Sequence, residues 1–127
     1  MKKFFIILMA AVFGLSMTSC LTKVKGTVEV KVVSDFGDPV EGETVYMYTS
    51  TSWDDFVRTP ATAERRIITD AEGIANFNIQ GIYFGIDNIA TLYFAIYDKN
   101  GKNVESYKAV QLKAGETKTI ELEKPIW

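Results

Sequence analysis

The sequence predicts an all-β protein, a single antiparallel β-sandwich of about seven strands over residues 26–127. Three observations predict this class. From Gly26 onward, apolar and polar residues alternate in short runs, which is the period of half-buried strands. Residues that favour turns recur between these runs at the spacing expected of a sandwich. Apolar residues at helical spacing are almost absent from the same stretch.

The first two strands are predicted from their alternation. "TVEVKVV" (27–33) and "ETVYMYT" (43–49) each place apolar side chains on one face, and "DFGDPVEG" (35–42) between them is dense in turn formers. In the second strand, Tyr46 and Tyr48 face away from the apolar residues. The residues expected to face inward are Val28, Val30, Val32, Val45 and Met47.

Three more turns organise the rest of the chain. We expect a hairpin over residues 65–79 that turns at Asp70–Gly73. A second hairpin is expected over residues 90–110, turning at Asp98–Gly101, and Ala114-Gly115 is the turn before a closing strand. The residues expected to face inward are Ala75, Phe77, Ile79, Leu92, Phe94, Ile96, Ile120 and Leu122.

An export signal precedes the predicted domain. Lys2 and Lys3 are followed by the apolar run "FFIILMAAVF" (4–13), which is the pattern of a secretory signal. The run is shorter than the roughly 20 residues that a membrane-spanning helix needs. The next residues, "MTSC" (17–20), resemble the lipobox of bacterial lipoproteins, with the chain's single cysteine at its end.

The lipobox resemblance implies a lipid anchor. In that family the cysteine is acylated on its thiol and on its new amine after the signal is cut, so Cys20 is expected to carry acyl chains such as palmitate. Two or more chains hold a protein stably on a membrane, whereas one does not. The alternative is an ordinary signal peptide followed by a free thiol. The predicted parts are a signal peptide (1–19), the lipidated cysteine with a short tether (20–25), and the sandwich.

The residues after the cysteine bear on location. Leu21 stands where the inner-membrane retention signal of enterobacterial lipoproteins has an aspartate, so an outer-membrane position is expected. Lipoproteins that Bacteroidetes send to the cell surface often carry an acidic cluster just after the cysteine. "LTKVKG" (21–26) has none, which favours the periplasmic face over the cell surface.

Three segments in a fixed order carry a second resemblance: "VEVKVVSDFGDPVEGETVYMY" (28–48), "TDAEGIANF" (69–77) and "QLKAGETKTIELE" (111–123). Together they resemble prealbumin-like β-sandwiches, which include carboxypeptidase regulatory-like domains and the B-type repeats of collagen adhesins. The resemblance implies this fold for most of the exported chain, as in small lipoproteins of Bacteroidetes. "GIYFGIDNIATLYFAIYD" (81–98) departs from the pattern, because it is longer and more apolar than the usual strand.

Two activities of that wider group do not fit these residues. Its hydroxyisourate hydrolases use histidines and a C-terminal Tyr-Arg-Gly-Ser, whereas this chain has no histidine and ends in "EKPIW". The collagen-adhesin repeats form a Lys–Asn isopeptide bond. Lys31 could supply the amine, but the last predicted strand, "ETKTIELEK" (116–124), contains neither Asn nor Asp. Neither activity is therefore expected.

Composition excludes further classes of function. A formal net charge of −2 argues against nucleic-acid binding, which needs basic patches. The absence of histidine, with the single cysteine expected to be lipidated, removes Ser-His and Cys-His catalysis and the usual zinc sites. The turns at Asp70 and Asp98 lack the bidentate glutamate of a calcium loop, so plain turns are expected. We expect no metal, no cofactor and no enzyme activity.

The loop "STSWDDFVRTPATA" (50–63) is the first candidate binding site, because loops of this length are usually functional. Ser52 is expected to cap a short helical turn that begins at Trp53, with Pro60 as its stop. The alternative is that Trp53 and Phe56 only plug the end of the core. The candidate contact residues of the loop are Trp53, Asp54, Asp55, Phe56 and Arg58.

Outward tyrosines form the second candidate set. Tyr46 and Tyr48 share a face of one strand, and Tyr93 and Tyr97 share a face of another. An exposed row of tyrosines can stack on sugar rings or anchor a protein partner. The alternative is cross-strand pairing on a partly covered sheet, without any ligand.

These residues favour a non-catalytic role, in which the protein binds or scaffolds a protein partner at the cell envelope. The alternative is an accessory glycan-binding lipoprotein that uses Trp53 and the outward tyrosines. A third class, an enzyme that uses Asp54 and Asp55 as acid and base, fits less well because adjacent carboxylates rarely converge on one substrate.

Overall fold

The computed structural model describes residues 24–125, which form seven strands and two single-turn 3-10 helices. The helices are η1 (Pro60–Thr62) and η2 (Gly81–Tyr83). The predicted signal peptide, Cys20 and residues 21–23 of the tether lie outside the described residues. The strands are β1 (Gly26–Ser34), β2 (Thr44–Thr49), β3 (Arg65–Ile68), β4 (Ile74–Ile79), β5 (Ile89–Tyr97), β6 (Val104–Lys113) and β7 (Thr117–Lys124).

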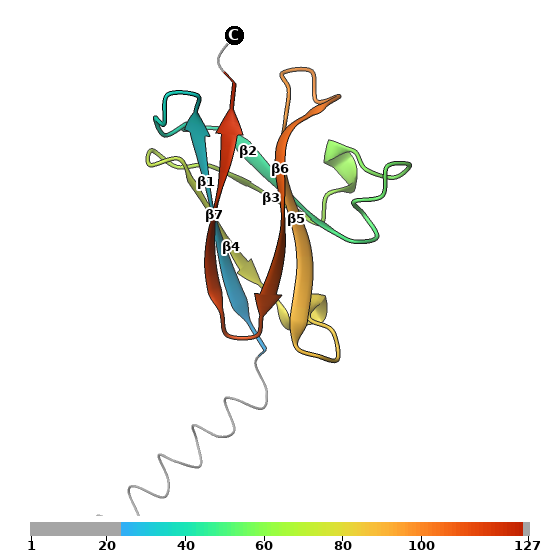
Figure 1. Ribbon diagram of the computed structural model, residues 1–127. Coiled ribbons are helices and arrows are strands. Elements are labelled where there is room, and N and C mark those ends of the chain that lie inside the picture. The colour runs from blue at the N-terminus through green and yellow to red at the C-terminus, as the bar shows by residue number, and fades with distance from the viewer. Residues whose placement is uncertain (1–23, 126–127) are drawn as a thin grey trace, which may run out of the picture.

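The strands build two sheets that pack face to face (Figure 1). One sheet has the order β4-β1-β7 and the other has the order β3-β2-β5-β6. Of the strand pairs between residues 24 and 125, only β1 with β7 is parallel, and the others are antiparallel. The architecture is a prealbumin-like, Ig-like β-sandwich, so the predicted fold class is confirmed. In the part of the chain described, no helix is long and apolar enough to cross a membrane.

The core lies between the inner faces of the two sheets. Every residue predicted to face inward is buried there except Ile120, which is partly buried and packs against the others. Phe77 of β4 and Phe94 of β5 meet edge to face across the core, with ring centroids 5.0 Å apart. The period-two pattern of the sequence therefore located the core.

The predicted hairpin over residues 65–79 is wrong, although its turn forms. The Gly73 N–H donates to the Asp70 carbonyl at 2.9 Å, and Gly73 has a φ of +78°, which favours glycine. β3 pairs with β2, however, and β4 pairs with β1, so the turn carries the chain from one sheet to the other. Alternation shows that a strand is half buried, but it does not name the neighbouring strand.

The predicted hairpin of β5 and β6 is confirmed. The two strands pair from Ile89–Lys113 to Tyr97–Val104, with a register shift at Ile96/Tyr97. The Gly101 N–H donates to the Asp98 carbonyl at 3.0 Å and closes the turn. The Asp98 carboxylate accepts the Lys102 N–H, which holds the pKa of Asp98 below its usual value. The aspartate therefore serves the turn, as the plain-turn prediction requires.

The strand directions give the sandwich two different ends (Figure 1). The end that we call the N-terminal end holds Val24, Lys25, residues 80–88 and the turn 113–116. The opposite end, which we call the acidic end, holds the loops 34–43, 69–73 and 98–103. The long loop 50–64 belongs to neither end, because β2 stops at Thr49, opposite Leu92 in the middle of β5.

Candidate functional site

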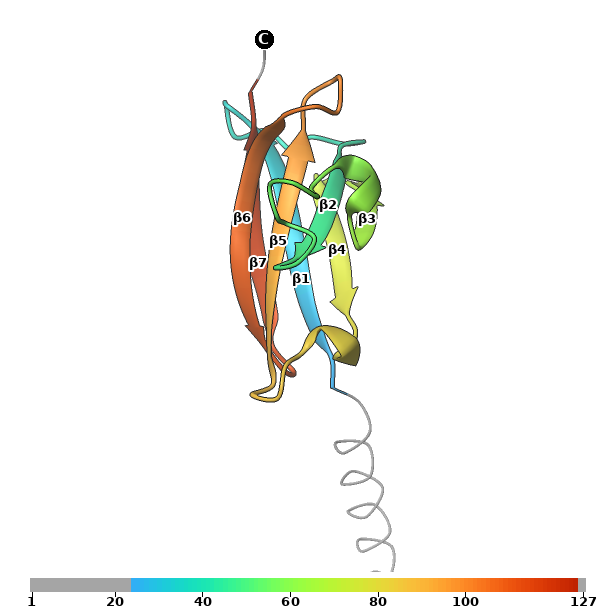
Figure 2. The ribbon, with the colours of Figure 1, turned by 90° about the vertical axis from the view of Figure 1, so that its right-hand side faces the viewer.

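The outer face of the four-stranded sheet carries the aromatic residues of the candidate site. The strand register sets them in two rows across the sheet. Tyr46, Ala95 and Tyr107 stand opposite one another in the first row. In the second row, Tyr48 and Tyr93 stand opposite each other. Figure 2 looks onto this face, where the loop 50–64 lies in front of β2 and β5.

Trp53 fixes the loop to these rows. Its indole stacks on Tyr93 with a ring-centroid distance of 5.1 Å and an interplanar angle of 4°. It also meets Tyr48 edge to face at 5.3 Å and Tyr107 in a tilted contact at 5.1 Å. Ala95 belongs to the same apolar cluster, and its small side chain leaves room for the indole between larger neighbours. Trp53 therefore forms a second core outside the sheet, rather than a plug at the end of the first.

Hydrogen bonds attach the far part of the loop to the same sheet. The Tyr48 hydroxyl donates to the Thr59 carbonyl at 2.7 Å and lies 2.7 Å from the Tyr97 hydroxyl. Burial, with a contribution from the Tyr97 hydroxyl, raises the pKa of Tyr48 far above that of a free phenol. The Tyr48 hydroxyl therefore keeps its proton and stays a donor to the loop.

The loop is also braced from within. The Arg58 guanidinium lies over the Trp53 ring, 4.4 Å from its centroid, and its Nη1 donates to the Trp53 carbonyl at 3.1 Å. The same Nη1 lies 3.0 Å from Asp55 Oδ1. Asp54 Oδ1 accepts the Phe56 N–H at 2.9 Å. Both predicted aspartates therefore shape the loop, and neither faces the other across a cleft.

The predicted helical turn in the loop is wrong in two details. The Ser52 hydroxyl accepts the Thr49 N–H at 2.9 Å, so it closes the turn before Trp53 instead of capping one after it. Pro60 begins η1 instead of ending a helix, with Thr59 as its N-cap. Proline fits the first position of a helix because the N–H that it lacks would have no partner there.

The tip of the loop is apolar and exposed. Phe56 is 99% exposed, and Val57 beside it is exposed as well. The Val57 and Arg58 N–H groups both donate to the Asp54 carbonyl, which closes a turn around Phe56. The Phe56 side chain is therefore presented to solvent by a backbone that is held on both sides.

The outward tyrosines do not form the exposed row that the sequence suggested. Tyr48 is fully buried and Tyr97 almost so. Tyr46 and Tyr93 are partly buried, Tyr46 against Tyr97 and Tyr93 against Trp53. Tyr107 of β6 is 56% exposed and was not among the site residues predicted from the sequence. The strand pattern does indicate that its side chain faces outward, because Tyr107 stands two residues before Ala109 on the face opposite to Val110 and Leu112.

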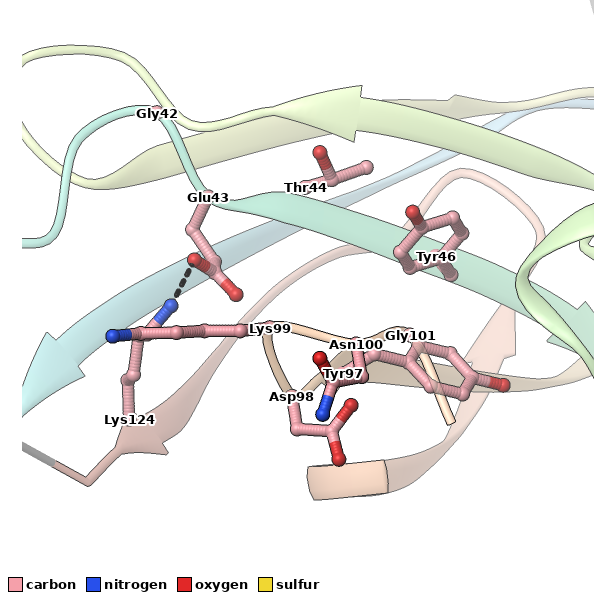
Figure 3. Close-up of a pocket in the computed structure, with 10 residues that line it drawn as sticks. All are labelled: Gly42, Glu43, Thr44, Tyr46, Tyr97, Asp98, Lys99, Asn100, Gly101 and Lys124. Carbon is pink, nitrogen blue, oxygen red and sulfur yellow. Dashed lines mark hydrogen bonds and ion pairs between the residues drawn. The ribbon is translucent and has the colours of Figure 1, made fainter. Parts of the chain in front are cut away.

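Two hollows lie beside these aromatic residues. One, of about 270 Å³, is lined by Trp53, Asp55, Arg58, Val104 and Tyr107. The other, of about 330 Å³, lies towards the acidic end, where Figure 3 shows the Glu43–Lys124 ion pair at one side and Tyr46 and Tyr97 at the other. Asp98 and Asn100 of the β5–β6 turn also line this second hollow.

The carboxylates that line these hollows are engaged in the fold. Glu43 is paired with Lys124, Asp98 holds its own turn, and Asp55 is paired with Arg58. Within residues 24–125 no group of three or more acidic, cysteine or histidine side chains is close enough to hold a metal ion. The arrangement offers aromatic surface and hydrogen-bonding groups for binding.

Comparisons with known proteins show the fold alone. No protein-family model and no curated protein matches the chain. Among solved structures, the TIE protein of Bacillus anthracis is 13% identical with a TM-score of 0.53, and the match covers 80% of this chain and 16% of that one. The dioxygenase domain of a dioxygenase carbohydrate-binding protein fusion from Streptomyces sp. SirexAA-E is 12% identical, with a TM-score of 0.49 and coverage of 82% and 81%.

A third solved structure is also similar. It is a DUF3823 family protein of Parabacteroides merdae, 12% identical with a TM-score of 0.46, and the match covers 79% of this chain and 45% of that one. The chain thus spans only a small part of the TIE protein and under half of the Parabacteroides protein. At these identities the likeness concerns the sandwich and carries no activity with it.

Proposed function

We propose that this protein is a non-catalytic lipoprotein of the bacterial cell envelope that binds a protein partner through the loop 50–64. The observation that carries the proposal is Phe56, which is 99% exposed at the tip of a loop that is braced by Trp53 and Arg58. Exposed aromatic side chains are frequent anchors of protein interfaces. A loop that is already ordered loses little conformational freedom on binding, which favours affinity.

The proposed absence of catalysis is supported by the chemistry of the site. Histidine is absent from the whole chain, and the carboxylates around the two hollows are paired or hold turns. Tyr48, whose pKa burial raises, is kept protonated where it attaches the loop. Each of these carboxylates already has a partner in the fold, which supports a binding role over acid–base catalysis.

Site-specific photo-crosslinking in the native host tests the protein-binding proposal. The variant carries Phe56→p-benzoylphenylalanine, and the matched control carries Phe36→p-benzoylphenylalanine, since Phe36 is 81% exposed at the acidic end. We expect a single crosslinked protein from position 56 and none from position 36. Adding Trp53→Ala, which frees the loop, is expected to weaken that crosslink strongly. Equal crosslinks from both positions, or none from position 56, would contradict the proposal.

A second candidate is glycan binding at the hollow beside Trp53. The observation that favours it is Tyr107, which is 56% exposed next to the Trp53 ring and Arg58, a combination that can stack on a sugar and hydrogen-bond to it. Affinity electrophoresis in gels that contain polysaccharide tests it. Retardation that Tyr107→Ala abolishes and Phe36→Ala leaves intact would favour this function. Normal mobility in every polysaccharide would remove it.

The envelope location is proposed from the sequence, because Cys20 lies outside the described residues. We expect the native protein to stay with the outer membrane and Cys20→Ala to become soluble. Protease added to intact cells is expected to leave the domain uncut until the cells are lysed, which corresponds to the periplasmic face. Digestion on intact cells would place the domain on the cell surface, and firm membrane association of Cys20→Ala would overturn the lipid anchor.

A further inference from the structure

The apolar segment 81–86 at the N-terminal end divides its side chains between the core and the solvent. Tyr83 and Phe84 are partly buried and pack against the core. Ile82 is 79% exposed and Ile86 is fully exposed. The packing of Tyr83 and Phe84 against the core accounts for part of the apolar character of this segment. The other two large apolar side chains, Ile82 and Ile86, remain exposed at the N-terminal end.

These two isoleucines lie at the end where the lipid anchor is attached. A Cβ on Gly81 would stand 3.1 Å from the Val24 carbonyl oxygen, so the segment touches the start of the described chain. The turn 113–116 completes the end, since Gly115 donates to the Lys25 carbonyl and Ala114 to the Asn88 carbonyl. The backbone of the segment is itself held, because the Asn88 N–H donates to the Gly85 carbonyl at 3.0 Å around Ile86.

The length of the tether keeps this end near the bilayer. Only four residue steps separate Cys20 from Val24, and an extended chain advances about 3.5 Å per residue, so Val24 lies within about 14 Å of the lipidated residue. Even a weak contact becomes effective at that range, because the tether makes it intramolecular.

Charge supports the same orientation. At the N-terminal end the charged side chains are balanced, with Lys25 and Lys113 accompanied by Asp87 and Glu116. The acidic end is the one that an anionic lipid surface would repel. Its acidic side chains include Asp35, Asp38, Glu41, Asp70, Glu72 and Glu123, and they outnumber the lysines of this end, Lys99, Lys102 and Lys124.

We propose that the N-terminal end is a membrane-contact surface, at which Ile82 and Ile86 enter the headgroup region of the bilayer that anchors the chain. The inference rests on the proposed lipid anchor at Cys20. Contact at this end turns the acidic end away from the membrane and holds the Phe56 loop to the side, where a partner can reach it.

The test uses the full lipidated protein in vesicles made from equal parts of phosphatidylethanolamine and phosphatidylglycerol. An environment-sensitive fluorophore is attached to Ile86→Cys, since acylation leaves Cys20 without a free thiol. The matched control is Phe36→Cys, which also replaces an exposed apolar residue, at the other end. We expect the label at position 86 to shift to the blue and to be quenched by nitroxide-labelled lipid, with neither effect at position 36. Moving the label to Asp87→Cys and adding Ile82→Ser and Ile86→Ser is expected to abolish the shift.

The outcomes separate this inference from the proposed function. An acylated protein whose label at position 86 behaves like the label at position 36 overturns the membrane contact and leaves the lipid anchor standing. A mature protein whose mass shows no acyl chain removes the anchor, and the inference with it. A blue shift that survives both serine substitutions also overturns the assignment to Ile82 and Ile86.

Discussion

The four-stranded sheet buries side chains on both of its faces, but by different means. The inner face, which includes Leu92 and Phe94, packs against the other sheet through apolar contacts alone. The outer face is covered by one loop, whose Trp53 lies on tyrosines and whose Thr59 carbonyl accepts a hydrogen bond from Tyr48. The inner core is therefore shared among many residues of seven strands, whereas the outer cluster depends on a few contacts.

This difference shows how a binding loop can be made rigid without being part of the main core. Stacked aromatic rings bury apolar surface, and the tyrosine hydroxyl groups form directional hydrogen bonds, so the loop is held in one position. Because Trp53 belongs to a cluster separate from the inner core, changes in the loop are expected to affect binding more than folding. The following predictions test that separation, from the largest expected effect to the smallest.

Removing a ring from the inner core should have the largest effect. Phe94→Ala is expected to lower the free energy of unfolding by about 4 kcal/mol, since it empties a fully buried position and removes the contact with Phe77. Urea denaturation followed by circular dichroism measures this change. A loss no larger than that of Trp53→Ala would mean that the two faces contribute equally to stability.

Trp53→Ala should cost less, about 2 kcal/mol, because the indole is only partly buried and the inner core remains. Its main effect is expected on the loop, which should be cut readily by trypsin at Arg58 while the sheets stay folded. Phe56→Ala is the control within the same loop and should change neither stability nor cleavage, since Phe56 is 99% exposed. Global unfolding of Trp53→Ala would show that the outer cluster belongs to the main core.

The hydrogen bonds of the outer cluster can be tested separately from its apolar contacts. Tyr48→Phe is expected to cost about 1–2 kcal/mol, since it leaves the Thr59 carbonyl and the Tyr97 hydroxyl without their partner. Tyr97→Phe in the same background should then cost less than it does alone, because the two hydroxyls interact. A double-mutant cycle by thermal unfolding measures the coupling, and strict additivity would argue against the hydrogen bond.

The smallest effect is expected at the acidic end, far from both cores. The hydrogen bond and charge of Asp35 raise the pKa of Glu123, so the folded state holds this proton more firmly than the unfolded state. The resulting stability is complete below the unfolded pKa of glutamate and is lost as the pH rises through the raised value. Glu123→Gln should therefore raise the melting temperature slightly at pH 7 and leave it unchanged or lower at pH 4. The reverse dependence would exclude this pairing.

The sequence by itself determined most of the inner core, because a strand's side chains alternate strictly between its two faces. Core residues of three strands could thus be assigned to one side without knowledge of their partners: Val28, Val30 and Val32, Val45 and Met47, and Leu92, Phe94 and Ile96. Ala90, Val110 and Leu112 complete that core and were not predicted. It also determined the turns at Asp70 and Asp98, since an aspartate that caps its own turn and a glycine that closes it act locally.

Only the tertiary structure decided which strands are neighbours and what lies outside the sheet. The turn after Ile68 crosses between sheets, and β7 runs parallel beside β1, because strand order depends on contacts between residues far apart in sequence. For the same reason the sequence showed Tyr48 and Tyr97 as outward, but could not show that they are buried in one cluster with Trp53. Burial on an outer face is a property of the loop that folds over it, and alternation within a strand carries no information about that loop.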